Sequence, residues 1–166
     1  MRFHAEHRFP APPAAVAAVL LDPGFHQGLD LPDVGRPQLV DHADNGDEGM
    51  LVLRYEYVGQ LDAVGRRLVG DRPLAWRQEL RLRRSTGRGE LRVAAEAGAD
   101  RLRAVADIEL VAEGGSSVRR VDGELTVRVP VVGRMAERRI VPGFLSRMDV
   151  EAAAVAERVR AGPAVS

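Results

Sequence analysis

The chain has 166 residues, of which 45% are hydrophobic and 29% are charged, the balance of a folded globular domain rather than of a disordered segment. Arginine supplies every basic side chain, and its 24 copies match 24 acidic residues. A chain without net charge lacks the overall positive potential that nucleic-acid binding requires, so we expect no nucleic-acid partner. Cysteine is absent, which excludes disulfides and thiolate sites and makes a reducing, cytoplasmic setting the default expectation.

The N-terminal segment alternates apolar and polar residues from Phe3 to Phe9, and this period of two predicts a half-buried strand. Pro12 and Pro13 then suit the first turn of a helix over residues 11–21. We interpret this apolar run as a helix, not as the core of a signal peptide. Residues 25–31 are expected to form either a second short helix or an irregular lid, which ends at Pro32. Because no segment approaches about 20 apolar residues, we expect no integral membrane segment.

Strand patterns dominate the middle of the chain. Asn45-Gly46 is a strong hairpin signal, and the other turns are rich in glycine. Residues 59–73 are expected to form a looser connection, either irregular throughout or with a short helix. The predicted strands are residues 34–43, 49–58, 74–84, 89–97, 102–112 and 117–129.

The C-terminal part changes to a helical period, which predicts a long helix over residues 133–160. One face of this helix is apolar, and Pro142 predicts a bend near Val141. No linker or repeat divides the chain, so we expect one domain over residues 1–160 and a flexible tail over 161–166. The apolar face consists of Phe144, Leu145, Met148, Ala152, Val155 and Val159.

Three motifs carry a resemblance that covers nearly the whole chain. They are Tyr55-x-Tyr57, Trp76-x-Gln78, and residues 129–133 ahead of Glu137. With the order of elements, they resemble the START-like, or helix-grip, superfamily of lipid-transfer proteins and polyketide cyclases, and most closely an uncharacterised bacterial family within it. The resemblance implies an α+β fold, in which a curved antiparallel sheet of about seven strands wraps the C-terminal helix and leaves a cavity between them.

Alternation along the strands predicts which side chains face this cavity. Alanines near the middle of the sheet favour a void over a filled core, and two tyrosines, a tryptophan and a glutamine supply polar groups. His7 lies an even number of residues from Phe3 and Phe9 in the first strand, so its side chain is expected to face inward with theirs. The expected ligand-binding residues are Tyr55, Tyr57, Trp76, Gln78, Ala95, Ala104, Ala106, Phe144, Leu145, Met148 and His7.

Chemical motifs are absent from the sequence. The four histidines lie in different elements or on opposite strand faces, and the acidic residues 41–48 do not match a calcium loop. No phosphate-binding loop or serine elbow occurs. We therefore expect no metal, no cofactor and no catalytic residue.

Three functions are compatible with this arrangement, and the sequence carries no signal of oligomeric state. The favoured one is a non-catalytic carrier or sensor of an apolar small molecule such as a lipid or a polyketide. The second is a cyclase or aromatase that uses the same cavity, with His7, Tyr55, Tyr57 or Gln78 as proton donors or acid–base groups. The third is a protein-interaction module that uses arginines on the convex face of the sheet, Arg77, Arg81 and Arg83.

Overall fold

The computed structural model describes residues 1–97 and 100–162, which form a seven-stranded antiparallel sheet and four helices. The order of elements is the one that the sequence predicts. The strands are β1 Arg2–Phe9, β2 Gln38–Asp44, β3 Glu48–Glu56, β4 Ala75–Arg83, β5 Arg88–Ala95, β6 Leu102–Glu113 and β7 Ser116–Val127. The helices are α1 Pro13–Leu20, α2 Pro23–Gln27, α3 Ala63–Val69 and α4 Gly133–Ala161.

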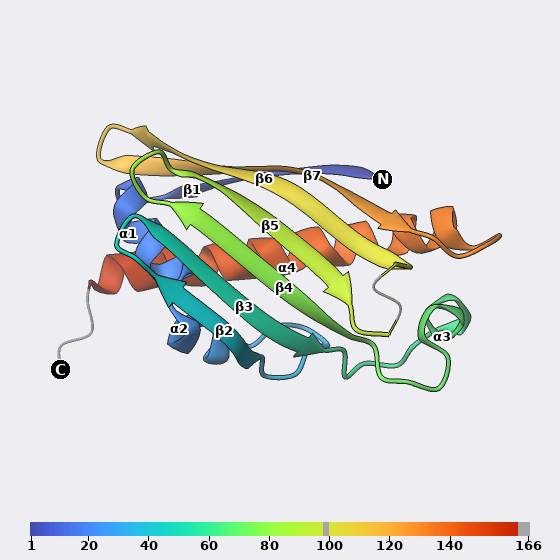
Figure 1. The fold of residues 1–166 in the computed structure, drawn as a ribbon. Coiled ribbons are helices and arrows are strands. Elements are labelled where there is room, and N and C mark those ends of the chain that lie inside the picture. Colours follow the sequence, from blue (N-terminus) through green and yellow to red (C-terminus); the bar gives the residue numbers. More distant parts are fainter. Residues whose placement is uncertain (98–99, 163–166) are drawn as a thin grey trace.

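The sheet has the strand order β1-β7-β6-β5-β4-β3-β2, so β1 forms one edge beside the last strand, and all other neighbouring strands follow one another in the chain. Helix α4 runs across one face of this curved sheet (Figure 1). Helices α1 and α2 lie at one end of the molecule and α3 lies at the other. This is the helix-grip arrangement of START-like proteins, and the predicted fold class is confirmed.

The predicted hairpins form with tight turns. Gly46 in the β2–β3 turn has φ +94, a conformation that glycine adopts without strain. Gly87 in the β4–β5 turn has φ +67 and lies so close to β6 that a Cβ atom would come within 2.2 Å of the Leu110 carbonyl oxygen. Strand β2 begins at Gln38, four residues later than predicted, because Val34 forms only an isolated bridge with Tyr57.

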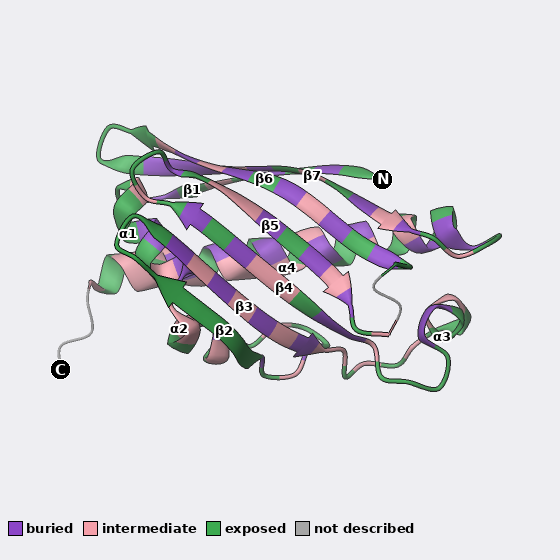
Figure 2. Cartoon of the chain, viewed as in Figure 1, coloured by how far each residue is buried: buried purple, intermediate pink, exposed green. Residues whose placement is uncertain are grey.

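The inner face of the sheet follows the predicted parity. Buried residues alternate with more exposed ones along β3 to β6 (Figure 2). The same parity extends backwards along β7 to Val121 and Arg119, which are both buried. An arginine side chain therefore enters the core from β7.

Helix α4 continues through Pro142 as one element. Pro142 is exposed, so the backbone carbonyl that its missing N–H leaves free lies on the outer side of the helix. The expected bend near Val141 does not interrupt the helix. The tail predicted for residues 161–166 lies, from residue 163 onward, outside the described residues. No helix within the described ranges is both long and apolar enough to cross a membrane.

Candidate functional site

Two charged side chains of α4 lie on its apolar face. Arg147 and Glu151 follow Phe144 at helical spacing and precede Val155, which is fully buried. Residues three or four positions apart lie on one side of a helix. The helix that closes the core therefore brings a cation and an anion toward the sheet.

Glu151 forms an ion pair with the buried arginine of β7. Arg119 Nη1 donates to Glu151 Oε1 at 2.5 Å, and the exposed fractions of the two side chains are 4% and 16%. Burial by itself raises the pKa of Glu151, but the positive charge of Arg119 and its hydrogen bond to Glu151 hold that pKa below its ordinary value. Glu151 is consequently ionised at neutral pH.

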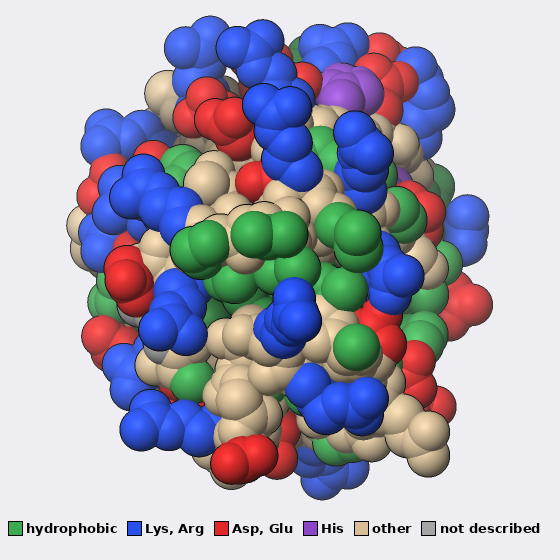
Figure 3. All heavy atoms as spheres, turned by 90° about the vertical axis from the view of Figure 1, so that its right-hand side faces the viewer, with side chains coloured by type: hydrophobic (Ala, Val, Ile, Leu, Met, Phe, Trp, Pro, Cys, Tyr) green, Lys and Arg blue, Asp and Glu red, His purple; other side chains and the backbone are tan. Residues whose placement is uncertain are grey.

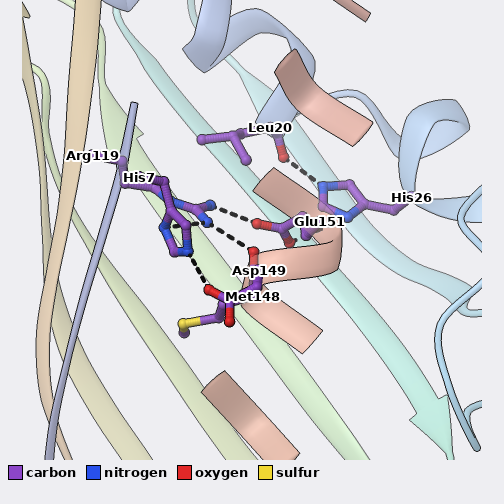
Figure 4. Close-up of polar contacts among 7 residues, drawn as sticks. All are labelled: His7, Leu20, His26, Arg119, Met148, Asp149 and Glu151. Atoms are coloured by element: carbon purple, nitrogen blue, oxygen red, sulfur yellow. Dashed lines mark hydrogen bonds and ion pairs between the residues drawn. The ribbon is translucent and has the colours of Figure 1, made fainter. Parts of the chain in front are cut away.

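His7 completes one side of this network (Figure 4). Arg119 Nη2 donates to His7 Nδ1 at 3.1 Å, and His7 Nε2 lies 3.0 Å from Asp149 Oδ1. Because a guanidinium only donates, Nδ1 is unprotonated and Nε2 carries the proton that Asp149 accepts. Burial and the charge of Arg119 lower the pKa of His7, against the opposing effect of Asp149. His7 is thus a neutral histidine with a defined tautomer.

His26 lies on the other side of Glu151. Its Nε2 donates to the carbonyl oxygen of Leu20 at 2.7 Å, and its Nδ1 lies 4.0 Å from Glu151 Oε2. The ring is 1% exposed and contacts the edge of Phe25. Within the described ranges, His26 Nδ1 and Arg119 Nε are buried nitrogens without a hydrogen-bond partner. The polar network is therefore incompletely satisfied where it approaches the interior.

A cavity of about 50 Å³ adjoins this network, between the sheet and α4. Arg119, Arg147, Glu151, His26 and Gln78 supply its polar lining. Its other lining residues are apolar or aromatic: Leu20, Leu31, Leu51, Leu53, Tyr55, Trp76, Leu80, Leu91, Ile108, Val121, Phe144 and Met148. Such a volume accommodates a few water molecules, far less than the roughly 300–1,000 Å³ of typical ligand sites.

Arg147 forms the polar end of the cavity near β3 and β4. Its guanidinium carbon lies 5.1 Å from the centre of the Trp76 ring, which in turn stacks on Tyr55 at 5.6 Å. Burial lowers the pKa of Arg147, although an arginine stays charged. Burial and the charge of Glu151 raise the pKa of Tyr55, so its hydroxyl stays protonated. No carboxylate of residues 1–97 or 100–162 forms an ion pair with Arg147.

Five of the predicted site residues line the cavity, namely Tyr55, Trp76, Gln78, Phe144 and Met148. Tyr57 is half-buried and lies against Gly59, where a Cβ atom would approach its hydroxyl to 2.5 Å. Leu145 packs at the edge of the core. His7 contacts the cavity only through Arg119.

The three alanines of the predicted site are buried in the core and do not line this cavity; they are Ala95, Ala104 and Ala106. Ala106 faces Gly123, where a Cβ atom would come within 2.5 Å of the Ala106 Cβ and 2.6 Å of the Phe3 ring. Phe3 in turn contacts Phe144 of α4 edge-on, at 5.3 Å between ring centres. Small residues here make room for two phenylalanines, and the space lies toward Arg119 and Glu151 instead.

Arg119, Arg147, Glu151 and His26 are the site residues that sequence reasoning missed. Three of them carried a usable signal. Arg119 has the inward parity of β7, and Arg147 and Glu151 fall on the apolar face of α4. No local sequence pattern marked His26, because its burial depends on how α2 folds against α4 and the sheet.

The family model described as "Protein of unknown function (DUF2505)" matches residues 4–159. The chain therefore belongs to this family. No curated protein matches the sequence.

Solved structures share the fold at low sequence identity. Norcoclaurine synthase from Thalictrum flavum, in complex with dopamine and hydroxybenzaldehyde, is 19% identical with a TM-score of 0.65, over 99% of this chain and 89% of that chain. The Zhui aromatase/cyclase from Streptomyces sp. R1128 is 15% identical with a TM-score of 0.61, over 99% and 100% of the two chains. A START superfamily protein from Mycobacterium smegmatis is 14% identical with a TM-score of 0.56, over 96% and 97%. These structures share the helix-grip fold of START-like proteins, so the fold implied by the predicted resemblance is confirmed.

Proposed function

We propose that this member of the DUF2505 family binds an amphipathic small molecule between the sheet and α4. The apolar part of the ligand lies among the inward leucines, and its anionic group lies on Arg147. The observation that carries the proposal is the position of the Arg147 guanidinium, at an apolar-lined cavity and over Trp76, without a carboxylate partner in the described chain.

The charges around the cavity support an anion at this end in particular. Arg119 is already neutralised by Glu151, so a second carboxylate beside that pair would be repelled. Arg147 has a planar guanidinium that can hold a carboxylate or phosphate in two parallel hydrogen bonds. The Tyr55 hydroxyl and the Gln78 amide line the same cavity and can donate as well.

Ligand binding requires the cavity to enlarge, because about 50 Å³ is too small for an organic molecule of this kind. Leu31, from the irregular connection between α2 and β2, is part of the cavity lining. A connection without regular secondary structure opens at a lower free-energy cost than a strand or a long helix. We therefore expect residues 28–37 to move when a ligand enters.

The test compares a fatty acid with the alcohol of the same chain length. Mass spectrometry of solvent extracts of the natively purified protein identifies any co-purified ligand, and calorimetry measures the binding of decanoic acid and decanol. Decanoic acid should bind more tightly, and Arg147→Gln should weaken its binding about 10- to 100-fold, the range expected for a hydrogen bond to a charged group.

Arg160→Gln is the matched control, since Arg160 is an exposed arginine of the same helix. It should leave both affinities unchanged. Equal binding of acid and alcohol to the unmodified protein would contradict the role of Arg147. A failure to bind any apolar compound, with nothing in the extracts, would contradict the proposed function itself.

A second candidate function is an enzyme of the cyclase type. It is favoured by the ionised Glu151 and the buried His26, which both line the cavity and can exchange protons with a substrate. Turnover of a polyketide-like substrate should then fall strongly in Glu151→Gln, a variant that can still accept from Arg119. Unchanged turnover in this variant, and in one that replaces His7, Tyr55, Tyr57 and Gln78, would exclude the enzyme.

A further inference from the structure

One end of the molecule combines exposed apolar side chains with a ring of arginines (Figure 3). This end consists of α3, residues 100–101 ahead of β6, the loop after β7 and the first turns of α4. Two contacts join these parts: Arg128 N donates to the Arg101 carbonyl oxygen, and the side chain of Arg139 in α4 forms an ion pair with that of Asp62, which precedes α3. We call this surface the basic end; its arginines are Arg66, Arg67, Arg72, Arg101, Arg128, Arg134, Arg138 and Arg139.

The basic end carries an excess of positive charge. Its eight arginines face four carboxylates, those of Asp62, Asp71, Asp100 and Glu137. Glu137 already binds the N-terminal amino group and the Val127 N–H. Apart from Arg139, none of the eight arginines forms an ion pair with another described residue. On the outer face of the sheet, by contrast, arginines such as Arg81 and Arg92 are paired with neighbouring glutamates.

The apolar part of the basic end is centred on the loop that leads into α4. Val131 is 98% exposed and Met135 is 51% exposed. Val131 also has φ +71, a conformation that is a genuine outlier for a β-branched residue. Strained backbone of this kind is uncommon and clusters at functional positions. A strained and fully exposed valine gains nothing from packing within this chain.

We propose that the basic end docks onto an anionic lipid bilayer. Val131 and Met135 enter the interface, and the surrounding guanidinium groups bind lipid phosphates. Apolar side chains at the centre of a cationic surface suit a bilayer, which offers both hydrocarbon and negative charge. A nucleic acid offers the charge but no apolar layer for Val131. Because the whole chain is neutral, the other surfaces carry the compensating negative charge, and this asymmetry orients the molecule with its basic end toward the membrane.

Vesicle co-sedimentation with the full chain tests this proposal. Vesicles of phosphatidylcholine with 30% phosphatidylglycerol should bind the protein at low salt, and pure phosphatidylcholine vesicles should not. Raising the salt concentration should release it. Each basic residue near the membrane surface contributes about fivefold in affinity, so the double variant Arg67→Gln/Arg138→Gln should weaken vesicle binding about 25-fold. Adding Val131→Asp to this double variant should weaken binding further.

The matched control for charge is Arg77→Gln/Arg92→Gln, which removes two exposed arginines from the outer face of the sheet. The matched control for the valine is Val40→Asp, on the edge strand β2. Both control variants should bind vesicles like the unmodified protein. Circular dichroism spectra of all variants serve to check that each one is folded.

Equal binding to neutral and anionic vesicles, no binding to either, or equal losses in the controls would overturn the proposal. So would tighter binding to a single-stranded RNA than to the anionic vesicles. None of these outcomes depends on the cavity, so the proposed ligand and the proposed membrane surface fail or succeed separately.

Discussion

Two ion pairs of the same length lie on opposite faces of the sheet. Arg119 and Glu151 meet at 2.5 Å inside the core, and Arg81 and Glu79 meet at 2.5 Å on the outer face, where 60% of the Arg81 side chain is exposed. Their distances are equal, but water screens only the outer pair. Burial, rather than distance, therefore sets what each pair contributes to stability.

Glu151→Ala should produce the largest loss of stability. It leaves Arg119 buried without a counter-charge, and breaking a buried pair in this way costs about 3–5 kcal/mol. Urea denaturation measures the change in the free energy of unfolding. A loss below about 1 kcal/mol would mean that water reaches Arg119 and that the inner pair behaves like the outer one.

Replacing both partners should recover most of that loss. Arg119→Met/Glu151→Leu removes the two charges together and fills the space with apolar side chains, a change that is often neutral or stabilising. The double variant should exceed Glu151→Ala by about 2 kcal/mol or more in its free energy of unfolding. If it is no more stable than the single variant, the pair contributes through geometry that apolar packing cannot replace.

Acidification should destabilise the protein through His7. Its pKa is lowered in the folded state, first by burial and then by Arg119, so the unfolded chain binds its proton more readily. Stability is then complete above about pH 6.5, the pKa of an unfolded histidine, and falls as the pH drops toward the lower, folded pKa. His7→Gln should flatten the dependence of the urea midpoint on pH between 7 and 5. An unchanged slope would contradict the lowered pKa of His7 in the folded protein.

Arg81→Ala should have the smallest effect. Exposed ion pairs contribute about 0–1 kcal/mol, so the free energy of unfolding should fall by less than 1 kcal/mol. High salt should reduce even this difference. A loss as large as that of Glu151→Ala would remove the distinction between the two faces.

Most of the fold could be predicted from the sequence, because strand and helix periods are local. The alternation of Leu51, Leu53 and Tyr55 sets their common face, and Asn45-Gly46 sets the hairpin that precedes them. The same local parity, carried further along β7 and α4, would also have placed Arg119 and Glu151 on the inner face.

The location of the cavity does not follow from local periods. Whether small residues leave a void depends on which large side chains from other elements reach them. The Phe3 ring fills the space beside Gly123 and Ala106, although it is more than 100 residues distant from them in the chain.

Which residues face inward follows from the local repeat of the chain. Which of the inward residues meet depends on how the strands and α4 pack together. The pairing of Arg119 with Glu151, of His7 with Arg119 and of Arg147 with Trp76 joins different strands and the terminal helix. Charge and burial act through space, and the distances that set them exist only once the sheet has closed around α4.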